Sequence, residues 1–176
     1  MSFRIEEKIN IKRENLYKFY EWLNLHSGHK IYPNRKISSI YFDNQNLNMY
    51  HDSVEGLIPR KKIRIRSYND LFFKKKNINL EKKITAAEGR FKETKIINDF
   101  DEKIRFGIFD QNYGICKPNI KVFYDRAYFK ILDFRVTLDM NINYSLYEGY
   151  KKFFQTIKDE NIIVEIKSQK VTDLNN

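Results

Sequence analysis

The alternating stretch that decides the fold is Arg60-Lys61-Lys62-Ile63-Arg64-Ile65-Arg66. Successive side chains of a β-strand point to opposite faces of a sheet, so residues two apart share a face. As a strand, this stretch places four cations on one face and two isoleucines on the other; the cations are Arg60, Lys62, Arg64 and Arg66. Because like charges on one sheet face repel each other, we expect an anion opposite them.

The same alternation recurs on five further strand patterns. Summed over the six, the charged faces carry ten cations and four acids: Arg4, Lys8, Arg60, Lys62, Arg64, Arg66, Lys83, Arg126, Arg135 and Lys167 against Glu6, Glu81, Asp139 and Glu165. One interpretation is that each strand turns a polar face to water, as half-buried antiparallel sheets do. The other is that a curled sheet brings the charged faces together around a phosphate polyanion, which suits arginine's planar fork. Carboxylates among phosphates would then indicate a bridging divalent cation such as Mg²⁺ or Mn²⁺.

Hydrophobic periodicity predicts mostly strands along the chain. The predicted strands are 3–11, 37–42, 60–68, 78–85, 90–98, 120–129, 132–142 and 161–168. The helical predictions are an amphipathic helix at 13–25, a short helix at 101–112 and a helix-like stretch near 149–158. Because several strands follow one another without a helix between them, we expect a mainly β (α+β) fold with an antiparallel sheet and a few flanking helices.

Composition limits the class of protein. The chain has 176 residues, which fits one domain, and its 33 Lys plus Arg against 23 Asp plus Glu give a net charge of +10. With 41% apolar and 15% aromatic residues, it is not a disordered basic tail. It lacks a run of about 20 apolar residues for a membrane helix and an apolar leader, and Cys116 alone forms no CxxC pair. We therefore expect a cytoplasmic domain with an anionic partner and no transmembrane segment.

A series of short motifs appears in a characteristic order. They are Arg4-x-Glu6-x-Lys8, Ser39-Ile40-Tyr41-Phe42-Asp43 with Tyr50 and Gly56, Arg60-x-Lys62-x-Arg64-x-Arg66-x-Tyr68, Leu80-Glu81-x-Lys83, Tyr124-Asp125-Arg126-x-Tyr128, Arg135-Val136-Thr137-Leu138-Asp139 and Val164-Glu165-Ile166-Lys167. This set resembles a VTC domain, the polyphosphate polymerase branch of the triphosphate tunnel metalloenzymes, over nearly the whole chain. The related CYTH branch opens with Glu-x-Glu-x-Lys, so Arg4 at the first position favours the VTC branch.

The resemblance implies a closed antiparallel β-barrel whose tunnel holds ATP and polyphosphate or triphosphate with Mn²⁺ or Mg²⁺. It implies transfer of the γ-phosphate of ATP to a growing polyphosphate chain. The residues that would grip phosphate are Lys8, Arg60, Lys62, Arg64, Arg66, Lys83, Lys92, Tyr124, Arg126, Arg135 and Lys167. Glu165 matches the family's metal-binding glutamate, and Glu81 and Glu6 are further metal candidates. Tyr124 would orient a phosphate oxygen or, alternatively, cap the barrel wall.

Two positions depart from the family pattern, and other functions stay open. Thr94 stands where the family has an arginine after Lys92, and the family's C-terminal helix is expected to be absent because the chain stops nine residues past Lys167. We therefore expect a single tunnel domain over 1–176.

The alternative functions are a binding module without turnover, a triphosphatase, and a nucleic-acid binder. That last function would need exposed rings for base stacking, for which Tyr68, Phe72 and Phe73 are candidates. Since most aromatics fall on apolar faces, no nucleic acid is expected.

Overall fold

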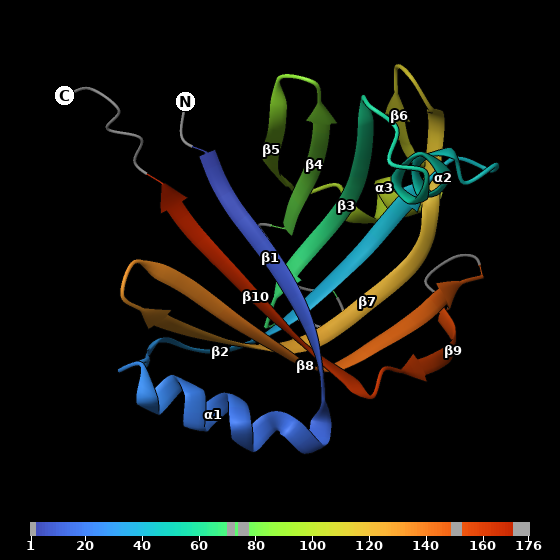
Figure 1. The fold of residues 1–176 in the computed structure, drawn as a ribbon. Coiled ribbons are helices and arrows are strands. Elements are labelled where there is room, and N and C mark those ends of the chain that lie inside the picture. Colours follow the sequence, from blue (N-terminus) through green and yellow to red (C-terminus); the bar gives the residue numbers. More distant parts are fainter. Residues whose placement is uncertain (1–2, 70–72, 74–77, 149–152, 171–176) are drawn as a thin grey trace. The chain divides into compact units, whose positions relative to one another are not determined.

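The computed structural model describes residues 3–69, 73, 78–148 and 153–170. Its strands are β1 (Phe3–Lys12), β2 (His29–Asp43), β3 (Arg60–Tyr68), β4 (Ile78–Ala86), β5 (Gly89–Ile97), β6 (Ile108–Asp110), β7 (Gly114–Ile131), β8 (Phe134–Tyr147), β9 (Phe153–Lys158) and β10 (Asn161–Lys170) (Figure 1). Its α-helices are α1 (Leu16–Leu25), α2 (Asn48–Val54) and α3 (Phe100–Phe106), and a 3₁₀ turn at Arg13–Asn15 precedes α1. Of the helices in these ranges, none is long and apolar enough to cross a membrane.

The strands form one antiparallel sheet in the order β1-β10-β8-β7-β2-β3-β4-β5, with β6 beside β7 and β9 beside β8. The predicted mainly β fold with flanking helices is confirmed. The predicted closure into a barrel is corrected, because β1 and β5 end the order and no pairing joins them in the ranges described. The sequence of β5 explains this: the strand is exposed along most of its length and carries Lys92, Glu93 and Lys95, and such charges are typical of an edge strand.

The described chain forms two compact units. Unit 1 comprises Met1–Lys36, Tyr124–Ile142 and Lys158–Asn176, and unit 2 comprises Ile37–Phe123 and Asn143–Ile157. The strands β2, β7 and β8 each contribute residues to both units. Each unit has its own hydrophobic core.

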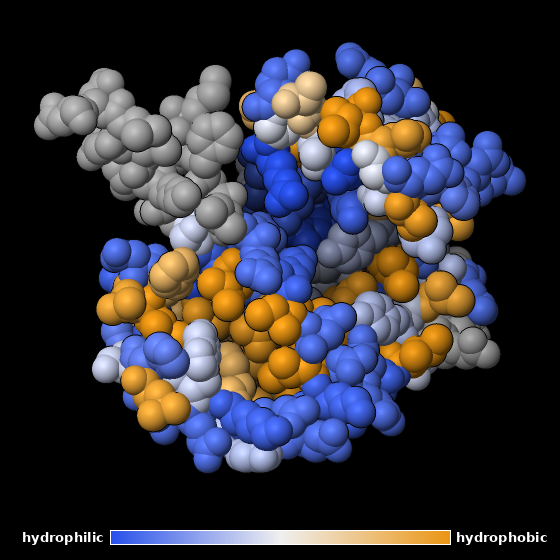
Figure 2. All heavy atoms as spheres, viewed as in Figure 1, coloured by the Kyte–Doolittle hydropathy of each residue, from blue (hydrophilic) through white to orange (hydrophobic). Residues whose placement is uncertain are grey.

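The core of unit 1 lies under α1. Phe19 and Leu23 recur at helical spacing and are both buried, and the edge of the Phe19 ring meets Phe129 with the centroids 5.8 Å apart. The predicted amphipathic helix is therefore confirmed, with its first turn in the 3₁₀ form. Between α1, β1 and β10 the core opens into an apolar hollow of about 390 Å³, and Figure 2 shows apolar side chains gathered along it.

The core of unit 2 contains the isoleucine face of β3. Ile63 and Ile65 are both 0% exposed, which confirms the predicted alternation on this strand. Helix α2 was not predicted. Its first turn is capped from a distance by Asp43, whose carboxylate accepts hydrogen bonds from the backbone N–H groups of Met49 at 3.0 Å and Tyr50 at 2.9 Å.

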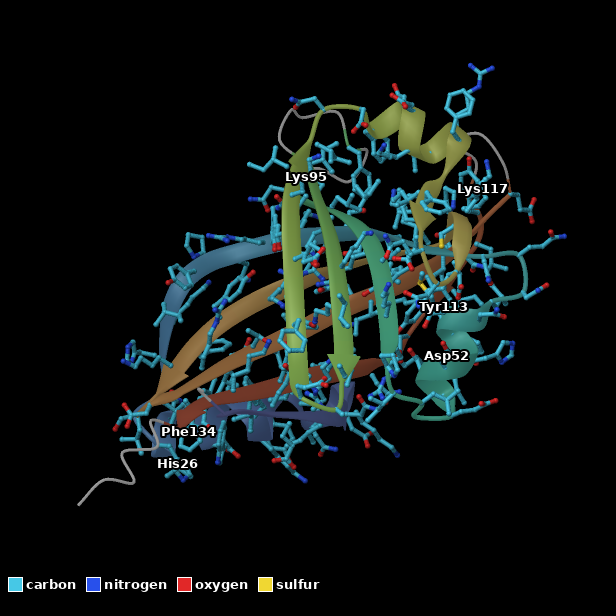
Figure 3. All side chains as sticks on the ribbon, turned by 90° about the horizontal axis from the view of Figure 1, so that it is seen from above. His26, Asp52, Lys95, Tyr113, Lys117 and Phe134 are labelled. Carbon is cyan, nitrogen blue, oxygen red and sulfur yellow. The ribbon has the colours of Figure 1, made fainter. Side chains whose placement is uncertain are left out.

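A second contact fixes α2 against the loop that precedes β7. The Tyr113 hydroxyl donates to Asp52 at 2.6 Å, and the two residues lie side by side in Figure 3. Burial and this carboxylate together raise the pKa of Tyr113 to about 12, so the phenol stays protonated as a donor. The helix is therefore held at both its start and its middle.

Several elements differ from the predictions in extent or in type: the strands predicted at 120–129 and 132–142 span Gly114–Ile131 and Phe134–Tyr147. The strand predicted at 37–42 begins at His29, and the helix predicted at 101–112 ends at Phe106, where Gly107 at φ +90° leads into β6. The predicted helix near 149–158 is wrong over 153–158, which forms β9 beside β8; residues 149–152 lie outside the described ranges. The aromatic and β-branched residues of β9 favour a strand once a neighbouring strand is available to pair with.

Candidate functional site

The four-cation face of β3 meets an anion from its own sheet. Arg64 and Arg66 are 8% and 7% exposed, and Glu81 of β4 lies directly opposite Arg64. Arg64 Nε donates to Glu81 Oε2 at 2.6 Å, and Arg66 Nη1 lies 3.7 Å from the same oxygen. Lys92 of β5 donates to Glu81 Oε1 at 2.7 Å. One carboxylate therefore holds three cations, which leaves this cluster with two excess positive charges.

Electrostatics keep the Glu81 cluster ionised. Burial of Glu81 alone would raise the pKa of its carboxyl, but Arg64, Lys92 and Arg66 together lower it to about 2. Burial of Arg64 opposes its charge as well, yet the neighbouring Tyr41 and Glu81 raise its pKa above the ordinary value. Arg64 and Glu81 are therefore both charged at physiological pH.

Two side chains of β2 orient the arginines. Arg64 Nη1 donates to the Tyr41 hydroxyl at 3.0 Å, and Arg66 Nε donates to Ser39 Oγ at 3.1 Å. Both contacts follow from strand register, since Tyr41 lies opposite Arg64 and Ser39 opposite Arg66. Sequence reasoning gave these two residues no role, and the signal that could have found them is the cross-strand pairing of β2 with β3.

A row of lysines lies beside the cluster. Lys62, Lys83 and Lys92 are opposite one another across β3, β4 and β5, and all three are exposed. A row of like charges destabilises a sheet face unless an anion covers it. Arg60 is engaged differently, because its Nη1 donates to the backbone oxygens of Gly56 at 3.2 Å and Leu57 at 2.9 Å. This contact ties down the loop after α2.

In unit 1, Arg126 is likewise held in place by a carboxylate. Arg126 of β7 donates from Nε and Nη2 to the two oxygens of Asp139, each at 2.6 Å, and Nη2 lies 3.7 Å from Glu165 Oε2. Its guanidinium also lies over the Tyr124 ring, 5.2 Å from the centroid. Burial would lower the pKa of Arg126, but the Asp139 hydrogen bonds and these neighbours raise it. Asp139 is thus an anchor that the sequence predictions did not include among the site residues.

Two carboxylates of unit 1 lie together at the pairing of β1 with β10. Lys167 Nζ lies 3.6 Å from Glu6 Oε2 and 3.2 Å from Glu165 Oε1. Glu165 is 5% exposed, and Lys8 lies opposite it on β1. Burial would raise the pKa of Glu165, but hydrogen bonding with Glu6 and the charges of Lys167, Arg126 and Lys8 lower it to about 2.

The chemistry of Glu6 and Glu165 fits a divalent cation. Mg²⁺ and Mn²⁺ take a few carboxylate oxygens and complete their coordination with phosphate oxygens or water. In the described ranges no group of three or more His, Cys, Asp or Glu residues is placed to hold a metal, so the protein would supply part of the ligand set only. Glu81 does not fit, because its two oxygens accept close hydrogen bonds of 2.6 and 2.7 Å from Arg64 and Lys92, whereas the cationic nitrogens near Glu165 lie 3.2 and 3.7 Å from its oxygens.

The predicted site residues therefore divide between the two units. Those of unit 1 are Glu6, Lys8, Tyr124, Arg126, Arg135, Glu165 and Lys167, and those of unit 2 are Arg60, Lys62, Arg64, Arg66, Glu81, Lys83 and Lys92. The rings cited for nucleic-acid binding are differently placed. Phe73 is buried and stacks on Phe100 with the centroids 5.0 Å apart, and Tyr68 is half-buried. Phe72 and the side chain of Arg4 lie outside the described set.

The sequence pattern of the VTC domain matches residues 3–106, which is more than half of the chain. The chain belongs to the VTC domain family. The matched part of this VTC domain includes the whole Glu81 cluster and ends before Arg126, Asp139 and Glu165. No curated protein is detectably similar in sequence.

Solved structures share the fold of this VTC domain. A candidate adenylate cyclase from Bacillus halodurans superposes with a TM-score of 0.61 at 14% identity, covering 94% of this chain and 80% of that one. A second candidate adenylate cyclase, from Vibrio parahaemolyticus, superposes with a TM-score of 0.53 at 12% identity, covering 96% of this chain and 78% of that one. A conserved hypothetical protein from Pyrococcus furiosus superposes with a TM-score of 0.55 at 17% identity, covering 97% of this chain and 81% of that one. Together with the family match, these likenesses identify a CYTH-like triphosphate tunnel fold.

Proposed function

We propose that this VTC domain is a metal-dependent polyphosphate polymerase of the cytoplasm, which transfers the γ-phosphate of ATP to a growing polyphosphate chain. The observation that carries the proposal is the excess charge around Glu81, where one buried carboxylate holds Arg64, Arg66 and Lys92. Phosphate oxygens would balance the remaining charge. The exposed row of Lys62, Lys83 and Lys92 would extend the same contact along the polymer.

Phosphoryl transfer asks little covalent chemistry of a protein. It requires in-line positioning and cations that face the charge developing on the transferred group. Arg64 and Arg66 meet this requirement because Glu81, Tyr41 and Ser39 hold their guanidinium groups in place before substrate arrives. Such preset cations need no reorganisation during the reaction.

Glu6 and Glu165 would hold the divalent cation, which when bound neutralises charge on phosphate oxygens. Lys167 contacts both carboxylates and would supply a cation for a phosphate oxygen beside them. Arg126 is held in one orientation because its Nε and Nη2 both donate hydrogen bonds to Asp139.

The direct test is to incubate the purified protein with ATP and Mn²⁺ or Mg²⁺ and to resolve phosphate polymers on a gel. A Lys62→Gln/Lys83→Gln variant should lose most polymer, because it removes two exposed cations and keeps the three that contact Glu81. Lys95→Gln is the matched control, since Lys95 is an exposed cation on the other face of β5. The proposal fails if the protein neither makes polymer nor binds tripolyphosphate.

The same assay separates the alternatives. Release of inorganic phosphate without polymer would indicate a triphosphatase, and tight binding of tripolyphosphate without turnover would indicate a binding module. A competition experiment tests the nucleic-acid alternative. If the proposed function holds, tripolyphosphate should displace a bound oligonucleotide at a much lower concentration than the oligonucleotide needs to displace tripolyphosphate. The reverse order would favour a nucleic-acid binder.

A further inference from the structure

Two arginines of unit 1 share one buried tyrosine ring. Tyr128 of β7 is 4% exposed, and the guanidinium carbons of Arg35 and Arg135 lie 5.6 and 5.5 Å from its ring centroid. Arg35 also lies 5.7 Å from the ring of Tyr32, which is 48% exposed and meets Tyr128 edge-on. Arg35 comes from β2, and its position in the sequence gave no indication of this role.

These two guanidinium groups are placed without acid partners. Among the residues described, neither Arg35 nor Arg135 forms an ion pair with a carboxylate, unlike Arg64 and Arg126. A cation over an aromatic ring is attracted by the negative face of the ring, which orients the guanidinium but leaves its charge unbalanced. Its N–H groups therefore stay available for an anion, and the planar fork suits a phosphate.

Arg135 is one of the cations already predicted to bind phosphate in unit 1, and the pair lies next to others of that set. Arg135 is opposite Lys167 across β8 and β10. Tyr128 is two residues from Arg126 on β7, so it shares that face about 7 Å further along the strand. We propose that Arg35 and Arg135 form a second phosphate subsite, which binds a phosphate of an inorganic polyphosphate chain longer than triphosphate. The chain-length part of this inference rests on the proposed function.

The test is the affinity of Arg35→Gln for three probes, measured by calorimetry: long-chain inorganic polyphosphate, tripolyphosphate and ATP. The dissociation constant for long-chain polyphosphate should rise about tenfold, the size of one lost charge-assisted hydrogen bond. Those for tripolyphosphate and ATP should change less than about twofold. Lys30→Gln is the control, because Lys30 is an exposed cation of the same strand; it should change all three affinities by less than about twofold.

Three outcomes would overturn the subsite. They are an unchanged affinity for long-chain polyphosphate, an equal loss in Lys30→Gln, and a loss confined to ATP, which would indicate base stacking on Tyr32. Arg35→Lys keeps the charge and removes the fork, and it should still weaken long-chain binding if Arg35→Gln does not fold. Failure of the unaltered protein to bind tripolyphosphate would count against the proposed function alone, since dependence of long-chain binding on Arg35 would still support the subsite.

Discussion

Arg126 holds Asp139 across β7 and β8 by two hydrogen bonds of 2.6 Å, one to each carboxylate oxygen. Both side chains are mostly buried, at 17% and 9% exposed. Arg126→Ala would leave Asp139 buried beside Glu165 without its partner, so we expect a loss of about 3 kcal/mol in the free energy of unfolding. Urea denaturation measures this loss.

A surface pair provides the control for that loss. Lys12 and Glu14 are 76% and 72% exposed, so Lys12→Ala should cost about 0–1 kcal/mol. Replacing both Arg126 and Asp139 by uncharged residues should recover part of the loss, because no charge is then left unpaired. Equal stability of Arg126→Ala and Lys12→Ala would show that the Arg126 pair contributes nothing beyond a surface contact.

Acid should weaken the fold through Glu81. The pKa of this carboxyl is about 2 in the folded chain and about 4.5 when unfolded, so its contribution is present above pH 4.5 and is lost as pH falls toward 2. The shift corresponds to about 3 kcal/mol. Glu165 has a similarly lowered pKa, so the unaltered protein loses both contributions in this window.

Urea unfolding at pH 7, 5, 4 and 3 isolates the contribution of Glu81 to the free energy of unfolding. Glu81→Gln should be less stable at pH 7 and lose less stability on acidification, because it lacks the titrating group. Glu93→Gln, on the exposed edge strand β5, should follow the unaltered protein at every pH. Parallel curves for Glu81→Gln and Glu93→Gln would contradict the assignment.

Mn²⁺ binding should depend on Glu165. Glu165→Gln removes one of two adjacent carboxylates, so we expect at least a tenfold weaker affinity for Mn²⁺, followed by electron paramagnetic resonance of the free ion. Glu7→Gln is the control, because Glu7 is exposed and lies on the other face of β1 from Glu6. A Glu165→Gln protein that binds Mn²⁺ as well as Glu7→Gln would remove Glu165 from the metal site.

Lys167 should compete with the metal. Its ammonium contacts both Glu6 and Glu165, so Lys167→Gln should bind Mn²⁺ more tightly in the absence of phosphate. The same variant should bind tripolyphosphate more weakly, because it loses a cation. Weaker binding of Mn²⁺ in Lys167→Gln would show that the lysine organises the carboxylates instead of occupying their site.

The two-residue period of the sequence predicted which side chains share a face, and this was enough to place Arg64, Arg66 and Glu81 on the charged faces of their strands. It did not predict what Glu81 does. That depends on the register of β3 against β4, which sets Glu81 opposite Arg64 and within reach of Lys92. Register depends on pairing between strands, so it cannot be read from either strand alone.

The elements that the sequence predicted poorly are those whose signals are not local. Helix α2 has only seven residues, too few for a clear period, and its cap comes from Asp43, before the loop that leads to it. The apolar residues of β9 fit a helical or an extended period equally well, and pairing with β8 decides between them. Arg35 was missed because its partner Tyr128 lies 93 positions away on another strand.

The pairing of β1 with β10 sets an order on biosynthesis. In the part of the chain that is described, β10 is the one neighbour of β1, and their register runs from Phe3 opposite Lys170 to Lys12 opposite Asn161. During synthesis β1 must therefore wait for β10, which is made after it. Glu6 meets Glu165 only at that point, so a nascent chain that stops before β10 lacks the pair of carboxylates proposed to hold the metal.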